Sequence, residues 1–279
     1  MFRIVHKRQL SEAVFEIGVE APKIAAKARA GQFLMVRIGE NGERIPLTFS
    51  DWSASEGWIR FIFMRVGKTT HELSHLEVGD FLADVVGPLG VATHTEGVGR
   101  VAVIGGGVGV AVAYPVARAL CAAGAEVTVI VGARNAELLI LEDELRALPL
   151  RELVICTDDG SAGRKGLVTH PLKELCDTGG IDAAFAVGPA IMMKFCAATT
   201  REFDVPTTVS LNPIMVDGTG MCGACRVTVD GEAKFGCVDG PDFDGHIVDF
   251  EQLMSRQRIY VDQEREADAD YSKGCQCHL

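Results

Sequence analysis

The run VAVIGGGVGVAVAYPVARAL at residues 101–120 decides how the centre of this 279-residue chain folds. Residues 101–104 are all apolar, which is typical of a strand buried on both faces of a parallel sheet. Glycines follow at 105–107 and 109, and an apolar helical stretch continues from them. A strand, a glycine loop and a helix in this order predict a helix N-terminus that binds a dinucleotide pyrophosphate. Because the glycines do not follow the G-x-G-x-x-G spacing, a loop that merely connects strand and helix is the alternative.

The alternation of strands and helices continues toward the C-terminus. Strand patterns fall at 126–133, 152–160 and 183–189, and helical patterns fall at 136–148, 169–176 and 190–199. This order predicts βαβ units and a parallel sheet. Ligands bind such sheets at the carboxyl ends of the strands, where Asp158 is placed to accept hydrogen bonds from ribose hydroxyls. The candidate dinucleotide-binding residues at that edge are Gly106, Gly107, Gly109, Val110, Asp158, Gly188 and Pro189.

The first hundred residues have a different pattern, with short alternating segments interrupted by Gly and Pro. Strands are expected at 15–22, 31–39, 45–53, 58–66 and 81–90, and the alternation before residue 15 favours a further strand. Several short strands at regular spacing predict a small antiparallel barrel.

Two pieces of this barrel carry chemical signals. Arg44 precedes a strand stiffened by Pro46, so its charge is placed to hold an anionic group while the Thr48 hydroxyl donates to a polar ring atom. The alternative is a solvated outer face. The sequence Gly67-Lys68-Thr69-Thr70 opens a helical run, which predicts a phosphate-binding helix N-terminus. A plain capped helix is the alternative there.

The segment DGTGMCGACRVTVDGEAKFGC at 217–237 carries the most specific signal. Asp217, Cys222, Cys225 and Cys237 follow the spacing by which plant-type ferredoxins ligate a [2Fe–2S] cluster, with Asp in the first position. The intervening glycines allow the backbone to approach sulfur with positive φ. Structural zinc and unligated buried cysteines are the alternatives. The segment therefore favours an electron carrier.

Composition excludes several other classes of protein. The net charge of −11 argues against a nucleic-acid partner, and no apolar run is long enough for a membrane span. The N-terminus lacks the apolar core of a signal peptide, so we expect a cytoplasmic protein. Nine cysteines in such a chain indicate metal ligation or reduced thiols before disulfides. The thiols expected to be unligated are Cys121, Cys156, Cys176 and Cys196.

These motifs together resemble the ferredoxin–NADP reductase superfamily, in particular its branch with a C-terminal [2Fe–2S] domain. That branch includes the electron-transfer subunits of dihydroorotate dehydrogenase B and the small subunits of NADH-dependent reduced ferredoxin:NADP oxidoreductases. The resemblance spans nearly the whole chain. It implies a flavin-binding β-barrel at 1–96, an NAD(P)-binding α/β domain at 97–208, and a [2Fe–2S] domain with a tail at 209–279. The motifs that carry it are RIPLT at 44–48, VGKTT at 66–70, GPLG at 87–90, GGGVGVAVAYPVARAL at 105–120, AVGPAIMM at 186–193 and the cysteine segment.

The resemblance also implies cofactors and roles. FAD is expected on Arg44, Pro46, Leu47 and Thr48, between Phe63 and Met64, with its pyrophosphate on Gly67, Thr69 and Thr70. The glycine loop and Gly188-Pro189 are expected to hold the nicotinamide dinucleotide against that flavin. No proton-transferring catalytic residue is expected, because the protein only positions the cofactors. A larger flavin and iron–sulfur subunit, and ferredoxin acting through it, are the expected partners.

Three points stay open at this level. Asp217 favours the reductase small subunits, whereas a dihydroorotate dehydrogenase B subunit and a zinc-stabilised, non-redox scaffold are the alternatives. Arg134, after a strand, favours a 2′-phosphate and NADP(H), but the resemblance favours NAD(H), which we expect here. The tail cysteines Cys275 and Cys277 are either a docking end or a source of the fourth cluster ligand.

Overall fold

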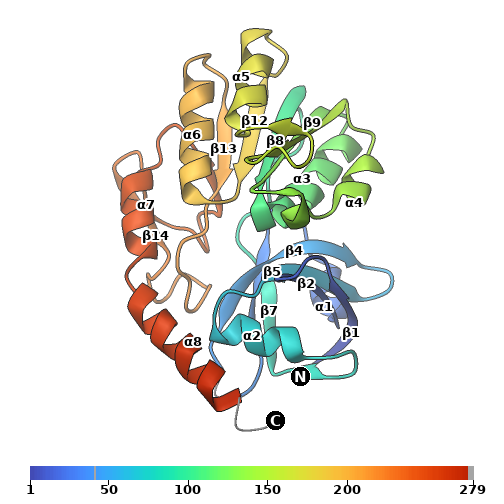
Figure 1. The fold of residues 1–279 in the computed structure, drawn as a ribbon, viewed down its shortest axis with the longest axis vertical. Helices are drawn as coiled ribbons and strands as arrows, with labels where there is room; N and C mark the ends of the chain where they lie inside the picture. The colour runs from blue at the N-terminus through green and yellow to red at the C-terminus, as the bar shows by residue number, and fades with distance from the viewer. Residues whose placement is uncertain (41, 276–279) are drawn as a thin grey trace.

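The N-terminal part of the chain is an antiparallel barrel. A computed structural model describes residues 1–40 and 42–275, and its first sheet has the order β6-β1-β2-β5-β4-β3-β7 (Figure 1). The alternation seen in the sequence places Ile4, Ile17, Phe49 and Phe61 in the barrel interior, where none of the four is exposed. The strands are β1 (Phe2–Gln9), β2 (Val14–Glu20), β3 (Phe33–Arg37), β4 (Ile45–Ser53), β5 (Trp58–Met64), β6 (Phe81–Leu82) and β7 (Asp84–Leu89), with helices α1 (Pro22–Ala25) and α2 (Lys68–His75).

The central part is a sheet covered by helices on both faces, as predicted. Its order is β11-β10-β9-β8-β12-β13-β16, and all its strand pairs are parallel except β13 with β16. Successive residues of β8 point to opposite faces: Val101 and Val103 pack toward α3, and Ala102 and Ile104 pack toward α5 and α6. The elements are β8 (Arg100–Gly106), α3 (Val110–Ala122), β9 (Glu126–Ala133), β10 (Glu152–Thr157), β11 (Arg164–Lys165), α5 (Thr169–Asp177), β12 (Ala183–Val187), α6 (Ala190–Arg201) and β13 (Thr207–Ser210), with a short turn η1 (Gly107–Gly109).

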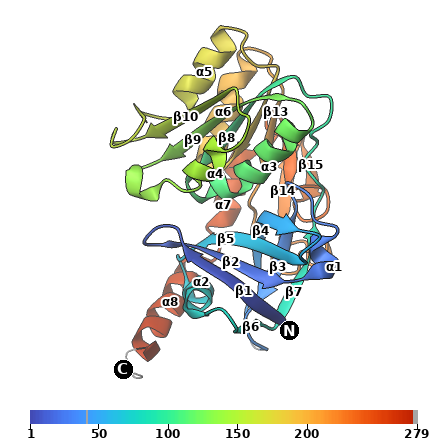
Figure 2. The same cartoon turned by 90° about the vertical axis from the view of Figure 1, so that its right-hand side faces the viewer.

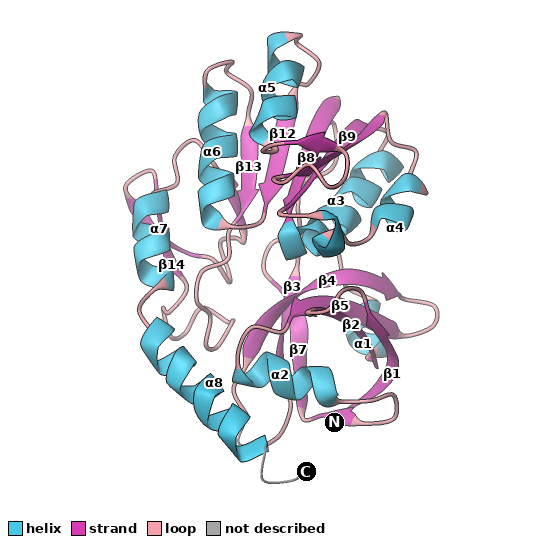
Figure 3. Ribbon diagram, in the orientation of Figure 1, coloured by secondary structure: helices cyan, strands magenta, loops and turns pink. Residues whose placement is uncertain are grey.

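The prediction of one continuous helix at 136–148 is wrong in its extent. The chain forms a single turn, η2 (Ala136–Leu138), and then a short helix, α4 (Glu142–Arg146), with Leu141 between them at φ 58° (Figure 3). A continuous helix spreads consecutive side chains around its axis. Here Ile140 and Leu141 are both buried, at 4% and 6% exposure, so the apolar run at 138–141 breaks the helix to bury them both.

The C-terminal part does not stand apart from the other two. Its hairpin, β14 (Arg226–Val229) with β15 (Glu232–Phe235), is followed by β16 (Asp242–Asp244), which joins the edge of the central sheet beside β13. Helix α7 (Phe250–Gln257) packs on α6, and helix α8 (Val261–Cys275) runs back to contact α2 of the barrel (Figure 2). The limits 1–96, 97–208 and 209–279 stay a prediction, and Cys277 lies outside the described residues.

Candidate functional site

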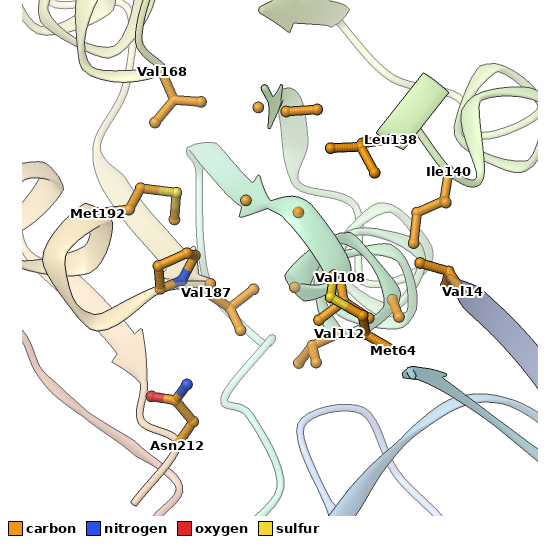
Figure 4. A pocket seen from close by; sticks show the side chains of 18 of the residues that line it. Val14, Met64, Val108, Val112, Leu138, Ile140, Val168, Val187, Met192 and Asn212 are labelled. Atoms are coloured by element: carbon orange, nitrogen blue, oxygen red, sulfur yellow. The ribbon is translucent and has the colours of Figure 1, made fainter. Parts of the chain in front are cut away.

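A pocket of about 900 Å³ lies between the barrel and the carboxyl ends of the central strands (Figure 4). Carboxyl-end clefts are where open α/β sheets bind ligands. Residues predicted to bind cofactors line both of its walls. From the barrel these are Pro46, Leu47, Thr48, Phe63, Met64 and Thr70; from the central sheet they are Gly106, Gly107, Gly109, Asp158, Gly188 and Pro189.

The glycine loop is shaped by the close approach of two backbones. A Cβ on Gly109 would lie 2.6 Å from the carbonyl oxygen of Val187, and one on Gly188 would lie 2.9 Å from that of Gly106. Any side chain at either position would force the loops after β8 and β12 apart. Gly107 adopts φ +56° and has open space where its Cβ would be, so the loop leaves room for a ligand at the start of α3.

Four of the predicted cofactor residues do not line the pocket. Arg44 donates from Nη2 to Asp84 Oδ2 at 3.1 Å, and Thr69 donates from Oγ1 to Glu43 Oε2 at 2.6 Å. Gly67 precedes α2, where its N–H donates to Thr70 Oγ1 at 3.0 Å. The fourth, Val110, is 1% exposed and packs in the core of the central domain.

Two charged side chains lie at adjacent strand ends in the pocket. Ala133 and Thr157 are paired across β9 and β10, so Arg134 and Asp158, which follow them, lie close together and both line the pocket. Both residues are exposed. Within the described part of the chain, the Arg134 guanidinium makes no hydrogen bond or ion pair. An anionic acceptor and an unpaired cation therefore lie at the same end of the site.

Several lining residues were missed from the sequence. Ile191, Met192 and Phe195 of α6 face the pocket, and Ser210 and Asn212 reach it from the end of β13. In the structure, two of them are marked as candidate ligand-binding residues by their exposure. Ile191 and Phe195 are apolar but 47% and 54% exposed, on a helix that otherwise buries its apolar face. Nothing in the local sequence marks Ser210 or Asn212.

The cysteine segment brings two of its four candidate ligands together. Cys225 and Cys237 are each 2% exposed, and their sulfurs lie 3.2 Å apart as free thiols, well beyond disulfide length. Phe33 and Met35 of β3 pack against the pair, together with Met215. Burial raises the pKa of the Cys237 thiol to about 12, and the neighbouring Cys225 adds to the rise. The Cys237 thiol ionises at neutral pH only where a metal ion offsets that cost.

The other two candidates, Asp217 and Cys222, lie on the loop that precedes this pair. Cys222 is exposed. The Asp217 carboxylate accepts a hydrogen bond from the Thr219 N–H at 2.9 Å and another from the Thr219 hydroxyl, and these bonds lower the pKa of Asp217. Among the side chains that the structure describes, which end at residue 271, no three His, Cys, Asp or Glu gather closely enough to hold a metal ion.

The loop backbone nevertheless suits an iron–sulfur cluster. Gly218, Gly220 and Gly223, between the candidate ligands, all have positive φ, at 84°, 87° and 67°. Residues with side chains rarely adopt this conformation, so the loop can turn its N–H groups and its ligands inward. Three thiols and a carboxylate that is already ionised supply donors that iron accepts.

Strand register connects the cysteine pair to the pocket. Phe33 is paired with Thr48, and Met35 with Pro46, across β3 and β4. Directly opposed residues of antiparallel strands project from the same face of the sheet. Phe33 and Met35 contact the cysteine pair, and Thr48 and Pro46 line the pocket. The two halves of the site therefore lie side by side on one face of this strand pair.

Comparisons with known proteins agree with this geometry. Residues 103–198 match the oxidoreductase NAD-binding domain, and residues 212–249 match the iron–sulfur cluster binding domain of dihydroorotate dehydrogenase B. A Thermotoga maritima protein, the "Dihydroorotate dehydrogenase B (NAD(+)), electron transfer subunit homolog", is 51% identical over 94% of this chain and 92% of its own.

Two solved structures add to this. A chain from the structure of NADH-dependent reduced ferredoxin-NADP oxidoreductase, described for flavin-based electron bifurcation, is 48% identical. It superposes with a TM-score of 0.91 over 97% of this chain and 98% of that one. The ferredoxin reductase of carbazole 1,9a-dioxygenase is 20% identical, with a TM-score of 0.62 over 74% of this chain and 65% of that one, which establishes the fold alone.

The barrel, the parallel sheet and the cysteine domain define a nicotinamide-dependent oxidoreductase of the ferredoxin reductase fold with an iron–sulfur module. The chain belongs to the family of dihydroorotate dehydrogenase B electron-transfer subunits and their homologues. No helix in the described ranges is long and apolar enough to cross a membrane.

Proposed function

We propose that this subunit passes electrons between NAD(H), FAD and a [2Fe–2S] cluster, and exchanges them with a larger flavin and iron–sulfur partner. The observation that carries the proposal is the shared face of β3 and β4. It puts Thr48 and Pro46 in the pocket beside Phe33 and Met35, which contact the cysteine pair. A partner is supported by relatives that are named electron transfer subunits. The use of ferredoxin is supported by the structure of an NADH-dependent reduced ferredoxin-NADP oxidoreductase, a chain of which is 48% identical.

When bound, FAD would supply the link between a two-electron donor, the nicotinamide, and a one-electron carrier, the cluster. The protein's own residues supply position. Thr48 would donate a hydrogen bond to the ring from the barrel wall, and Thr70 would lie at the pyrophosphate end. Met64 would border the ring site, and Phe63, which is 2% exposed, would support that wall from the barrel core. Gly107, Gly109 and Gly188 leave backbone space for the dinucleotide. We assign no residue a proton-transfer role.

We further propose that Asp217, Cys222, Cys225 and Cys237 ligate the cluster. Cys225 and Cys237 lie together on the barrel side, and the glycine-rich loop carries the other two. Asp217 needs no deprotonation at neutral pH, since the hydrogen bonds from Thr219 lower the pKa of its carboxyl. A hard oxygen ligand in a thiolate position is expected to change the reduction potential of the cluster.

The proposed nucleotide is NAD(H), although two neighbouring charges compete. The Asp158 carboxylate suits the hydroxyls of an unphosphorylated ribose, and the Arg134 guanidinium suits a 2′-phosphate. The proposal gives Asp158 the ribose and leaves Arg134 to the pyrophosphate or solvent. Asp158→Asn combined with titration by NADH and NADPH tests the choice. We expect the preference for NADH to fall in the variant, and an unchanged ratio of the two affinities would refute it.

Purification without oxygen tests the function as a whole. We expect flavin, iron and acid-labile sulfide in one sample, and rapid bleaching of the flavin absorption on addition of NADH. A colourless protein that contains zinc would refute the proposal. The copurifying subunit separates the proposal from the runner-up, because a dihydroorotate dehydrogenase as partner would favour the pyrimidine enzyme suggested by the names of several relatives.

A further inference from the structure

The last turn of α7 contacts both the cysteine loop and the pocket. Arg256 Nη2 donates to the carbonyl oxygen of Ala224, between Cys222 and Cys225, at 3.0 Å. The next residue, Gln257, donates from Nε2 to Asn212, reaching its carbonyl oxygen at 2.9 Å and its side-chain Oδ1 at 3.0 Å. Two consecutive residues of the iron–sulfur module therefore bind the two halves of the site.

These hydrogen bonds fix the orientation of both amides. A backbone carbonyl can only accept, so the Gln257 atom that contacts the Asn212 carbonyl must be the NH₂ nitrogen. The same nitrogen faces the Asn212 side chain, so the Asn212 atom that meets it must be the acceptor Oδ1. The Asn212 NH₂ group is therefore turned away from Gln257.

That NH₂ group faces the pocket. Asn212 lines the cavity, and its amide nitrogen lies on the side of the cavity while its oxygen lies on the opposite side (Figure 4). In the described ranges Nδ2 has no hydrogen-bond acceptor. Most of the surrounding surface is apolar, including Val112, Val187 and Met192. A directed N–H donor on such a surface selects a carbonyl oxygen of a ring ligand.

We propose that Asn212 donates a hydrogen bond to a carbonyl oxygen of a heteroaromatic ring bound in this pocket, and that Gln257 is the positioning residue that keeps the donor pointing inward. The inference rests on the proposed function, which puts two such rings there. The oxygen belongs either to the nicotinamide carboxamide or to the pyrimidine ring of the flavin. Through Arg256, the same helix turn also ties this donor to the cysteine loop.

Four variants of the holoprotein separate orientation from simple loss of contact. Asn212→Ala removes the donor and should weaken the affected interaction roughly three- to tenfold. Asn212→Asp puts a charged acceptor in its place and should weaken it further. Gln257→Glu replaces the donor at position 257 by an acceptor. The new carboxylate accepts from the Asn212 NH₂ group and turns Asn212 Oδ1 into the pocket, so this variant should resemble Asn212→Asp. Gln257→Leu only removes the hydrogen bond that holds the Asn212 amide in place, so it should have the smallest effect of the four.

Gln252→Leu is the matched control. Gln252 lies on the same helix and accepts a hydrogen bond from Thr228 Oγ1 at 2.6 Å, away from the pocket. This variant should leave every readout below at the wild-type value while costing similar helix stability. The combined variant Asn212→Ala with Gln257→Leu should match Asn212→Ala alone, because Gln257 acts only through Asn212.

Two binding readouts identify the ring. The dissociation constant of NAD⁺ is measured by calorimetry on the oxidised holoprotein, and the absorption spectrum and midpoint potential report on the bound flavin. Weaker NAD⁺ binding with an unchanged flavin assigns the nicotinamide carboxamide. A shifted flavin spectrum and potential with unchanged NAD⁺ binding assign the flavin carbonyl.

If neither readout changes in Asn212→Asp, or if Gln257→Glu behaves like Gln257→Leu, the inference is wrong. Wild-type protein that carries flavin and is bleached by NADH keeps the proposed function intact in that case. Wild-type protein without flavin or NADH reactivity would instead refute the function itself.

Discussion

The pocket is built from regular backbone, whereas the four candidate cluster ligands lie in the loops around the β14–β15 hairpin. The pocket is shaped by strands β4, β8 and β12 and by the start of α3. Backbone hydrogen bonds between strands hold these walls in place, and they do not depend on a bound ligand. Of the four candidate ligands, only Cys225 and Cys237 are held by packing, against Phe33 and Met35. Asp217 and Cys222 lie on a loop whose glycines have positive φ. Dinucleotide binding therefore needs little rearrangement, while metal binding and the conformation of this loop are coupled.

The largest effect should follow from removing one of the packed thiols. Cys225→Ala removes one of the two proposed ligands that are buried, so we expect iron and acid-labile sulfide to fall to background while FAD stays bound. Cys196→Ala is the control, since Cys196 is fully buried in the central core and far from the loop in sequence. Loss of flavin together with iron would show that the two regions do not act separately.

Gly107→Val tests the pocket side. The new side chain enters open ligand space, so the dissociation constant of NADH should rise by about tenfold or more, while the iron content is unchanged. The backbone at φ +56° adds strain of about 1–2 kcal/mol. Gly124→Val carries similar strain, at φ +89°, beyond the end of α3 and outside the pocket. Equal NADH affinities in the two variants would contradict the assignment of the loop.

Asp217→Ala should have a smaller effect than loss of a packed thiol. Asp217 lies on the glycine-rich loop, whose backbone can adjust when one ligand is lost. We therefore expect partial loss of iron and a shifted cluster signal in electron paramagnetic resonance. Asp239→Ala is the control, because Asp239 also accepts a backbone hydrogen bond in this segment, from Phe235 N at 2.6 Å. A full iron content and an unaltered signal in Asp217→Ala would exclude Asp217 as a ligand.

The smallest expected effect on the cofactors lies where the regions meet. Asp242 of β16 accepts a hydrogen bond from Thr93 Oγ1 at 2.5 Å, and burial raises the pKa of Asp242 to about 6. The folded protein therefore binds a proton that the unfolded chain has released between about pH 4 and pH 6. Stability falls as pH rises through that window, by roughly 2–3 kcal/mol for a shift of this size.

Asp242→Asn removes this dependence. Thermal unfolding should show a higher melting temperature than wild type at pH 7.5 and little gain at pH 4.5, with cofactor content unchanged at both. A gain of the same size at both pH values would mean that the titration of Asp242 does not contribute to stability.

Much of the fold was predictable because its signals are local. The apolar strand at 101–104, the glycines after it and the following helix each depend on near neighbours in sequence, and all three are confirmed. The helix prediction at 136–148 failed because contacts between residues distant in sequence set the backbone there. Leu141 takes a left-handed conformation because the core of the central domain buries it, and that core consists of residues distant in sequence.

Short stretches of sequence are enough to establish the class of each region, since strand period, glycine placement and cysteine spacing are properties of short segments. Which side chains meet follows only from how the whole chain packs. Cys225 touches Cys237, Phe33 and Met35 lie opposite Thr48 and Pro46, and Gln257 orients Asn212 from 45 residues away. Such pairings depend on strand register and on helix packing across the whole chain, and no local pattern of residues encodes them.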